Sequence, residues 1–477
     1  MENASDNDVE FERIRRETKK SLPSLLFVFI IGNLMIQCFN LVYSNIGTSL
    51  HVSATAAALL STLPGIILGI VCMLYETLCD FISPKKMVLW GVGVLIVSSV
   101  VGFFLSFNFW VVVVVRALQV AGAQVAGSVF LIMTVKFLNK KEKAIYLGVF
   151  NAAYYLSVAL GVFAGGWIQD MPWKWLLLIP ALAIFVFPIL VKDTPNVSGK
   201  GEKVDSIGII IFAGIATCLA VYFSYMQFWW LWIIFGVLVI GFSFNVAKNK
   251  RSFITPKFLK NGRYMILLAL LCISFFFEFA CTPIYQVIGD GVFQIPLQQV
   301  SWWLTGVNLV AMVVGIFSGP LVNKLGHYTV ITLSLVAEIV GFGLSAAFIH
   351  SSFWFLSILN AITIAGFTAI YTPIYDAASA ALPQEERGRA IGICDLIVNI
   401  SPSIGIAVYS DLIENAALGH ATLFGIKGMT ACQTANVFWI MFLVALASLI
   451  LVLICKKPIS SVVKKAVSVD TDEDIAQ

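Results

Sequence analysis

The chain has 477 residues, of which 59% are hydrophobic and only 12% are charged, and its mean hydropathy is +0.93. A soluble domain carries about twice that charged fraction, so the composition argues against a soluble protein and points to one that is surrounded by lipid. The net charge of +4 is small and gives no evidence for nucleic-acid binding.

Long apolar runs recur along the whole chain, and most are close to the ~20 residues that an α-helix needs to span a bilayer. The first run is too long for a signal-peptide core and has no small-x-small cleavage site, so it is counted as a helix. The sequence therefore predicts an all-α polytopic membrane protein with fourteen transmembrane helices, at 22–48, 53–75, 87–106, 109–136, 143–168, 174–191, 206–224, 229–246, 264–288, 299–322, 329–348, 352–381, 390–415 and 433–455.

Basic residues concentrate in alternate loops. If the amino-terminal segment is cytoplasmic, 27 of the 30 Lys and Arg residues fall in cytoplasmic segments. The remaining three are Lys174 and Lys427, in loops on the other side, and Arg116, inside the predicted helix 109–136. This asymmetry predicts a protein of the cell membrane with both termini in the cytoplasm.

Motifs for catalysis, metals or cofactors are missing from the sequence. The nine cysteines are scattered without a C-x-x-C pair, and the four histidines lie far apart. No Walker loop, H-E-x-x-H motif, nucleophile elbow or dinucleotide fingerprint is found. We therefore expect no enzyme activity, no metal and no cofactor. Because an ATP-binding motif is missing, any active transport by this chain would have to draw its energy from an ion gradient.

The sequence contains an internal repeat. RALQVAG (116–122) aligns with NAITIAG (360–366) at an offset of 244, and LCDFISP (78–84) aligns with LVNKLGH (321–327) at 243. Two related six-helix halves can rock about a central site, which is the basis of alternating access. The predicted organisation is an amino-terminal cytoplasmic segment (1–21), a first half (22–192), linkers with two inserted helices (193–263), a second half (264–455) and a cytoplasmic tail (456–477).

Two short motifs point to a family. The loop after the second helix, ETLCDFISPKK, keeps three positions of the pattern G-x-L-x-D-x-x-G-x-K/R and has a second lysine after it, and the fourth helix keeps three positions of R-x-x-Q-G-x-G. Over nearly its whole length the chain resembles the fourteen-helix members of the major facilitator superfamily, above all the tetracycline and multidrug proton antiporters of Gram-positive bacteria. The resemblance implies a gating motif at Asp80, Lys85 and Lys86.

Arg116 is the one basic residue in the interior of a predicted helix, away from its ends. Its repeat partner is Asn360, so the fold does not need a charge at this position. The resemblance implies that Arg116 takes part in proton coupling. The alternative is that its side chain extends to the membrane surface, about 9 Å along the helix.

Three acidic residues could carry the proton. Glu278 follows three phenylalanines and its repeat partner is Ile36, and such surroundings favour the neutral carboxylic acid, as a proton carrier requires. Asp395 lies one turn inside the thirteenth helix, and Asn399 follows it on the same face. The third is Asp376, near a helix end, where a solvated side chain is the main alternative to a role in carrying the proton.

Uncharged polar residues and glycines mark the expected cavity and helix contacts. Asn33, Gln37 and Asn40 follow the spacing i, i+4, i+7 on one face of the first helix, which suits a cavity wall together with Asn399 or, alternatively, bonds between helices. We expect close helix packing at Gly122, Gly161 and Gly165.

Two transport functions remain open. The fifth helix lacks the antiporter proline, and the first helix lacks the carboxylate that multidrug relatives carry. These departures favour proton-linked movement of an amphipathic organic anion, such as a bile acid, or of a neutral molecule. The alternative is export of tetracycline or other drugs by proton antiport. A membrane sensor that does not transport is a third class of function and is disfavoured. A lipid flippase is a more distant possibility. The expected partners are the substrate, protons and the bilayer, and the chain is expected to act as a monomer.

Overall fold

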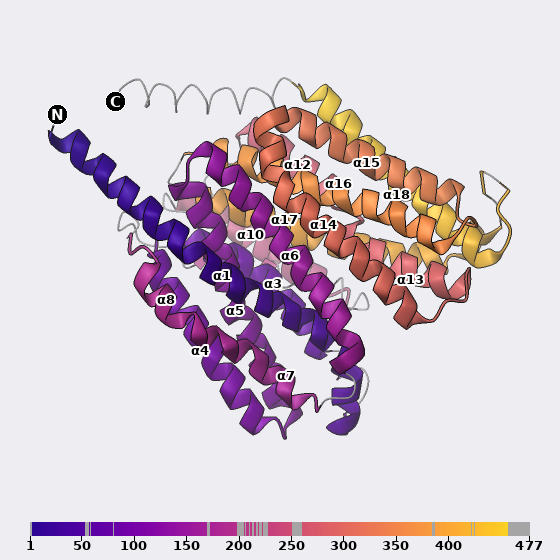
Figure 1. Ribbon diagram of the computed structural model, residues 1–477, viewed down its shortest axis with the longest axis horizontal. Helices are drawn as coiled ribbons and strands as arrows, with labels where there is room; N and C mark the ends of the chain where they lie inside the picture. The colour runs from indigo at the N-terminus through magenta and orange to yellow at the C-terminus, as the bar shows by residue number, and fades with distance from the viewer. Residues whose placement is uncertain are drawn as a thin grey trace. The chain divides into compact units, whose positions relative to one another are not determined.

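The computed structural model describes residues 2–52, 57, 59–79, 81–168, 172–197, 228–249, 260–383, 387–420, 422–423 and 425–456, with a few positions between 205 and 222. In these residues every regular element is a helix (Figure 1). The predicted all-α class is therefore confirmed.

The first group of helices begins with an unusually long one. α1 (Glu2–Ser49) has 48 residues, about 72 Å of helix, more than twice the ~30 Å of a bilayer core. The predicted segment 1–21 and the first membrane helix thus form one continuous helix. The elements that follow are α3 (Leu59–Leu78), α4 (Pro84–Leu105), α5 (Phe109–Phe137), α6 (Lys140–Ile168), α7 (Lys174–Leu178), η1 (Ile179–Phe185), α8 (Phe187–Asp193) and α10 (Leu231–Lys248).

A charged contact fixes the amino-terminal part of α1. Arg15 donates two hydrogen bonds to the Glu142 carboxylate at the start of α6, from Nε at 3.0 Å and from an NH2 group at 2.8 Å. Lys19, one turn further along α1, also contacts Glu142. Bidentate Arg–carboxylate pairs are among the stronger ion pairs, so this contact favours a helical amino-terminal segment.

The second group of helices follows the linker after α10. It consists of α12 (Gly262–Ser274), η2 (Glu278–Ala280), α13 (Cys281–Gly291), α14 (Leu297–Leu325), α15 (His327–Ala347), α16 (Phe353–Ala380), α17 (Arg387–Glu414), η4 (Ala416–Gly419) and α18 (Met429–Ile454).

Eleven helical spans within the described residues are long and apolar enough to cross a membrane. α3 and α17 coincide with two further predicted runs. The remaining run, 206–224, lies mostly outside the described residues. The multi-pass character is therefore shown, whereas the count of fourteen stays a prediction.

Two predicted helices are broken. The run 174–191 is divided into α7, η1 and α8, and Pro180 and Pro188 stand at the starts of η1 and α8. The run 264–288 is divided into α12, the 3-10 turn η2 and α13, which contains Pro283. Proline has no N–H to donate to the carbonyl four residues earlier, so it favours such interruptions. As a consequence, Glu278 lies at the break between two membrane helices.

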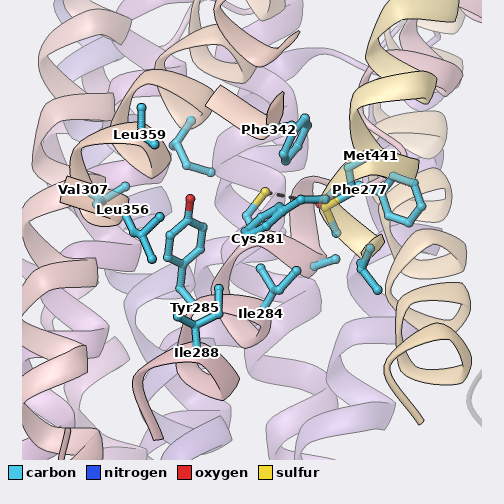
Figure 2. Packing of buried hydrophobic residues seen from close by; sticks show 14 of the residues in the cluster. Phe277, Cys281, Ile284, Tyr285, Ile288, Val307, Phe342, Leu356, Leu359 and Met441 are labelled. Atoms are coloured by element: carbon cyan, nitrogen blue, oxygen red, sulfur yellow. Dashed lines mark hydrogen bonds between the residues drawn. The ribbon is translucent and has the colours of Figure 1, made fainter. Parts of the chain in front are cut away.

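The chain divides into two compact units. The first comprises 1–143, 160–260 and 383–396, and the second comprises 144–159, 261–382 and 397–477, so that α6 and α17 each contribute to both. The core of the first unit contains Phe39, Val112 and Leu177. The core of the second is rich in aromatic residues, and Figure 2 shows part of it around Phe277, Cys281 and Tyr285.

Apolar side chains also cover the outside of several helices. On α10, Ile233, Val237, Ile240 and Phe244 are 59–64% exposed. Contiguous exposed apolar surface of this kind suits a helix that faces lipid, because its backbone groups are bonded within the helix.

Glycines allow some helices to approach closely. A Cβ atom at Gly122 of α5 would lie 2.7 Å from the Gly91 carbonyl oxygen and 2.8 Å from the Leu95 nitrogen of α4. A Cβ at Gly161 of α6 would overlap the Gln37 side chain of α1. Gly165 lies in α6, but its surroundings are outside the described part.

We expect Gly122→Val to lower the melting temperature of the purified protein in detergent. The new side chain would push α5 away from α4, and overpacking of this kind costs about 1–3 kcal/mol. The matched control is Gly93→Val on α4, where an added Cβ would meet nothing within 4 Å. Equal melting temperatures for the two variants would contradict the close contact.

Candidate functional site

Arg116 of α5 lies in the interior of the first unit. Only 1% of its surface is exposed. Its guanidinium carbon lies 3.8 Å from the centroid of the Phe39 ring on α1. The side chain therefore does not extend to the surface of the unit, as the alternative interpretation required.

A short polar network holds this guanidinium. An Arg116 NH1 group donates to Gln119 Oε1 at 3.0 Å. Gln119 Nε2 in turn donates to Ser99 Oγ of α4 at 3.0 Å and to the Leu177 carbonyl of α7 at 2.8 Å. Gln119 is thereby fixed by two neighbouring helices, with its amide oxygen turned towards the arginine.

The positive charge of Arg116 has no carboxylate partner among the described residues, and its Nε donates no hydrogen bond to them. A desolvated cation over an aromatic ring gains about 2 kcal/mol or more, which compensates only part of the cost of burying a charge. Such a charge attracts an anion, either a carboxylate of the protein or an anionic ligand.

Glu278 lies in the second unit, at the break between α12 and α13. Its Oε1 accepts a hydrogen bond of 2.7 Å from the Tyr155 hydroxyl of α6. The carboxyl is half-buried, whereas Tyr155 is buried. A carboxyl that is partly accessible and held by a phenol can exchange a proton without losing its position.

The same face of α6 is bonded to α16. Asn151 Nδ2 donates to the Thr368 carbonyl at 2.8 Å, whereas the Thr368 hydroxyl donates to the Ile364 carbonyl of its own helix at 2.7 Å. Helix α6 is thus bonded to α16 through Asn151 and to the turn η2 through Tyr155.

A further buried carboxyl, Glu338 of α15, was not singled out from the sequence. It is 1% exposed, and its Oε1 accepts no hydrogen bond from the described residues. Its side chain packs against α16, where a Cβ added at Gly366 would lie 2.9 Å from Glu338 Cγ. Figure 2 shows Cys281 in the apolar core, where its thiol donates to the Phe277 carbonyl at 3.5 Å. Glu338 is the one charged residue of the apolar stretch VAEIVGFG, so the sequence could have singled it out for the same reason as Glu278.

The other predicted coupling and cavity residues are distributed over both units. Asp395 is buried in the first unit, and Asn399 is half-buried in the second. Asn33 is 8% exposed and donates to the Phe29 carbonyl of its own helix at 3.0 Å, whereas Gln37 is half-buried. The side chain of Asn40 lies outside the described part.

The predicted gating motif is only partly described. Asp80 lies outside the described residues, Lys85 is half-buried and Lys86 is exposed. Ser83 caps α4: its Oγ accepts from the Lys86 nitrogen at 3.3 Å and donates to Asn196 Oδ1 at 2.8 Å. The loop is thereby tied to the segment that follows α8.

Asp376, expected to be solvated at a helix end, is instead buried. It is 4% exposed, and its Oδ2 lies 2.5 Å from Nε2 of His327 at the start of α15. The pair joins the start of α15 to α16 within the second unit. No group of three or more potential metal ligands occurs in the described part of the chain.

Comparison with known proteins identifies the family. The model of the Major Facilitator Superfamily matches residues 25–291 and 266–470. The chain belongs to the Major Facilitator Superfamily. Together with its membrane-spanning helices, this membership makes it a multi-pass membrane protein of a transporter family.

Curated relatives within the superfamily are distant. An uncharacterized MFS-type transporter of Mycobacterium tuberculosis (strain CDC 1551 / Oshkosh) is 24% identical over 56% of this chain and 41% of its own length. The multidrug transporter protein MdtP of Bacillus subtilis (strain 168) is 23% identical over 49% of this chain and 46% of its own length. The chain thus spans less than half of the length of either relative. The multidrug resistance protein Stp of Mycobacterium tuberculosis (strain CDC 1551 / Oshkosh) is 22% identical over 75% of this chain and 68% of its own length.

Solved structures show the same fold. The human organic anion transporter MFSD10 (TETRAN) has a TM-score of 0.61 at 12% identity, with 91% of this chain and 99% of that chain covered. The proton:xylose symporter XylE has a TM-score of 0.59 at 12% identity, with 91% and 95% covered. The predicted major-facilitator fold is confirmed.

Proposed function

We propose that this transporter is driven by the proton gradient and moves an amphipathic organic solute across the cell membrane by alternating access. The observation that carries the proposal is Glu278, a half-buried carboxyl at a helix break, whose oxygen is held by Tyr155. Broken membrane helices are a common place for substrate and coupling-ion sites in transporters. Glu278 binds and releases the proton in this mechanism, with Asp395 as the alternative carrier.

The proposed substrate is an organic anion, such as a bile acid, or a neutral amphipathic molecule. Arg116 supports this preference, because its buried charge has no carboxylate partner among the described residues. Asn33, Gln37, Asn40 and Asn399 are the proposed polar residues of the cavity, and Arg116 links the bound anion to proton movement.

The alternative function is export of tetracycline or other drugs by proton antiport. It is supported by the similarity to MdtP and Stp, whose names describe multidrug transport and multidrug resistance. Both functions use the proposed arrangement of two halves, 22–192 and 264–455, in a monomer with cytoplasmic termini.

Flux measurements distinguish the two functions. Purified protein in proteoliposomes is given an imposed pH gradient and one of three probes: taurocholate, tetracycline or the dye cation ethidium. The proposal expects taurocholate to accumulate, with loss of accumulation when an uncoupler collapses the gradient. Accumulation of tetracycline or ethidium against an opposite proton flow supports the alternative. Absence of gradient-driven movement of all three contradicts both.

We further expect Asp80→Asn to reduce turnover sharply while the protein still reaches the membrane in normal amounts. In the proposed mechanism Asp80 stabilises the outward-open state by charge pairing and helix-end contacts on the cytoplasmic face. The measurement is initial transport rate normalised to membrane abundance, with Asp193→Asn at the end of α8 as a control. A normal rate for Asp80→Asn would remove this gating role.

A further inference from the structure

An apolar groove lies on the outside of the first unit, between α4 and α5. The two helices run side by side (Figure 1), and both are long and apolar enough to cross a membrane. The groove has a volume of about 860 Å³ and is lined by residues of α4 between Leu89 and Val101 and of α5 between Trp110 and Leu118. It is therefore a hollow in a surface that faces lipid.

The groove suits an apolar chain. An added Cβ at Gly93 would meet nothing within 4 Å, so the groove is open there. Apart from two tryptophans, Ser98 is the one polar residue of the lining, and its hydroxyl donates to the Leu95 carbonyl of its own helix at 3.1 Å. From Leu89 to Val101 the helix rises by about 18 Å, more than half of the ~30 Å hydrocarbon core. An acyl chain from one leaflet can therefore lie in the groove lengthwise.

The end of α4 that precedes the groove is positively charged. Lys85 is half-buried and Lys86 is exposed, and neither side chain forms an ion pair or a hydrogen bond with the described residues. Trp90 follows Lys86 at a spacing of four, and Val97 continues the same face of the helix. Lysine and tryptophan both favour the headgroup level of a membrane. The groove thus begins about one helical turn from a pair of ammonium groups.

Other described charges at this end of α4 do not neutralise the two lysines. Lys136, near the end of α5, is itself basic and donates to the Cys79 carbonyl at 3.3 Å. Asp193 ends α8, which packs on α4, but Lys192 precedes it, so this segment adds no net charge. The described part of this end therefore attracts an anionic group.

We propose that the groove between α4 and α5 binds an acyl chain of an anionic phospholipid, whose headgroup lies at Lys85 and Lys86. Both parts of the lipid are matched, because the apolar groove takes the chain and the lysines attract the phosphate. A second copy of this chain fits less well. In a two-fold dimer with its axis across the membrane, both copies present the same patch. The lysines of the two α4 helices would then meet at the same level and repel each other.

Photocrosslinking of full-length protein tests the groove. The photoreactive residue p-benzoylphenylalanine replaces Val97, an exposed residue of the lining. The protein is reconstituted in liposomes with equal amounts of phosphatidylglycerol and phosphatidylcholine that carry identical acyl chains. After irradiation, mass spectrometry of the intact protein distinguishes the two lipid adducts from a crosslinked second copy of the chain.

The matched control carries the photoreactive residue at Val237 of α10, which is also exposed and lies eleven positions from Lys248, as Val97 does from Lys86. The ratio of phosphatidylglycerol to phosphatidylcholine adducts at position 97 should exceed that at position 237 by at least about fivefold, the effect of one additional lysine near a lipid surface. Replacing Lys85 and Lys86 together by glutamine should remove this excess.

Gly93→Phe separates the groove from the lysines. It fills the open space and leaves both lysines in place, so the excess at position 97 should also fall towards the ratio at position 237. Melting temperatures in detergent show whether the variants fold. If Gly93→Phe lowers its melting temperature, Val94→Trp, at an exposed residue of the lining, takes its place.

Three results would overturn the proposal. Equal ratios at positions 97 and 237 would mean that the groove selects no lipid. An excess that survives in the filled groove would mean that the lysines act without it. Crosslinking of position 97 to a second copy of the chain would make this face a protein interface. Because Lys85 and Lys86 also belong to the predicted gating motif, lipid adducts are the readout and transport is not.

Discussion

Glu278→Gln is expected to abolish pH-driven accumulation of substrate, to a ratio of about one between inside and outside, and to preserve exchange of substrate between the two sides. Glutamine keeps an oxygen that can accept the 2.7 Å hydrogen bond from Tyr155, and its volume matches that of the protonated acid. It cannot release a proton, so alternating access continues without coupling. Both quantities are measured on the same reconstituted protein.

The matched control for this prediction is Asp290→Asn, which removes an exposed carboxyl from α13. We expect it to accumulate substrate like the wild type. If accumulation and exchange both survive in Glu278→Gln, Glu278 is not the coupling residue, and Asp395 of α17 becomes the leading candidate.

Arg116→Ala is expected to lower the transport rate by about tenfold or more, whereas Arg116→Lys should retain partial activity. Interactions of a charged group are worth about 1.5–3 kcal/mol, and each 1.4 kcal/mol corresponds to about tenfold in rate. Lysine restores the positive charge. It lacks the planar guanidinium group, which bonds Gln119 and at the same time lies over the Phe39 ring. The rates are compared at equal protein density in proteoliposomes.

A third variant at this position separates charge from packing. Arg116→Met fills most of the same space without a charge, so the account expects it to be as inactive as Arg116→Ala. Full activity in the methionine variant would show that Arg116 only fills space between α5 and α1. Normal activity in the alanine variant would remove any role for the residue.

The sequence predicted the helical class, most of the membrane runs and the two isolated charges because each depends on local pattern. Arg116 and Glu278 stand out in apolar runs whatever their neighbours are. Tyr155 could not be found in the same way, since it meets Glu278 only through the packing of α6 on η2, 123 positions apart in the chain. Asp376 was expected near solvent, and its burial against His327 likewise depends on the contact between two helices.

Glu338 illustrates a different limit. Its isolation within VAEIVGFG was visible in the sequence, and the repeat offset of 243 already aligned it with Leu95. What the sequence did not show is that both side chains occupy the same buried contact, next to Gly366 and Gly122. The helix break at Glu278 was also missed, because the apolar run continues through Pro283 without a change in hydropathy.

The most direct test of proton coupling is the movement of protons themselves. Wild-type proteoliposomes are loaded with a pH-sensitive dye, no gradient is imposed, and taurocholate is added outside. The account predicts a change of internal pH that depends on taurocholate, follows its uptake in time and is absent in Glu278→Gln. Uptake of taurocholate by the wild type with constant internal pH would contradict a proton-coupled mechanism.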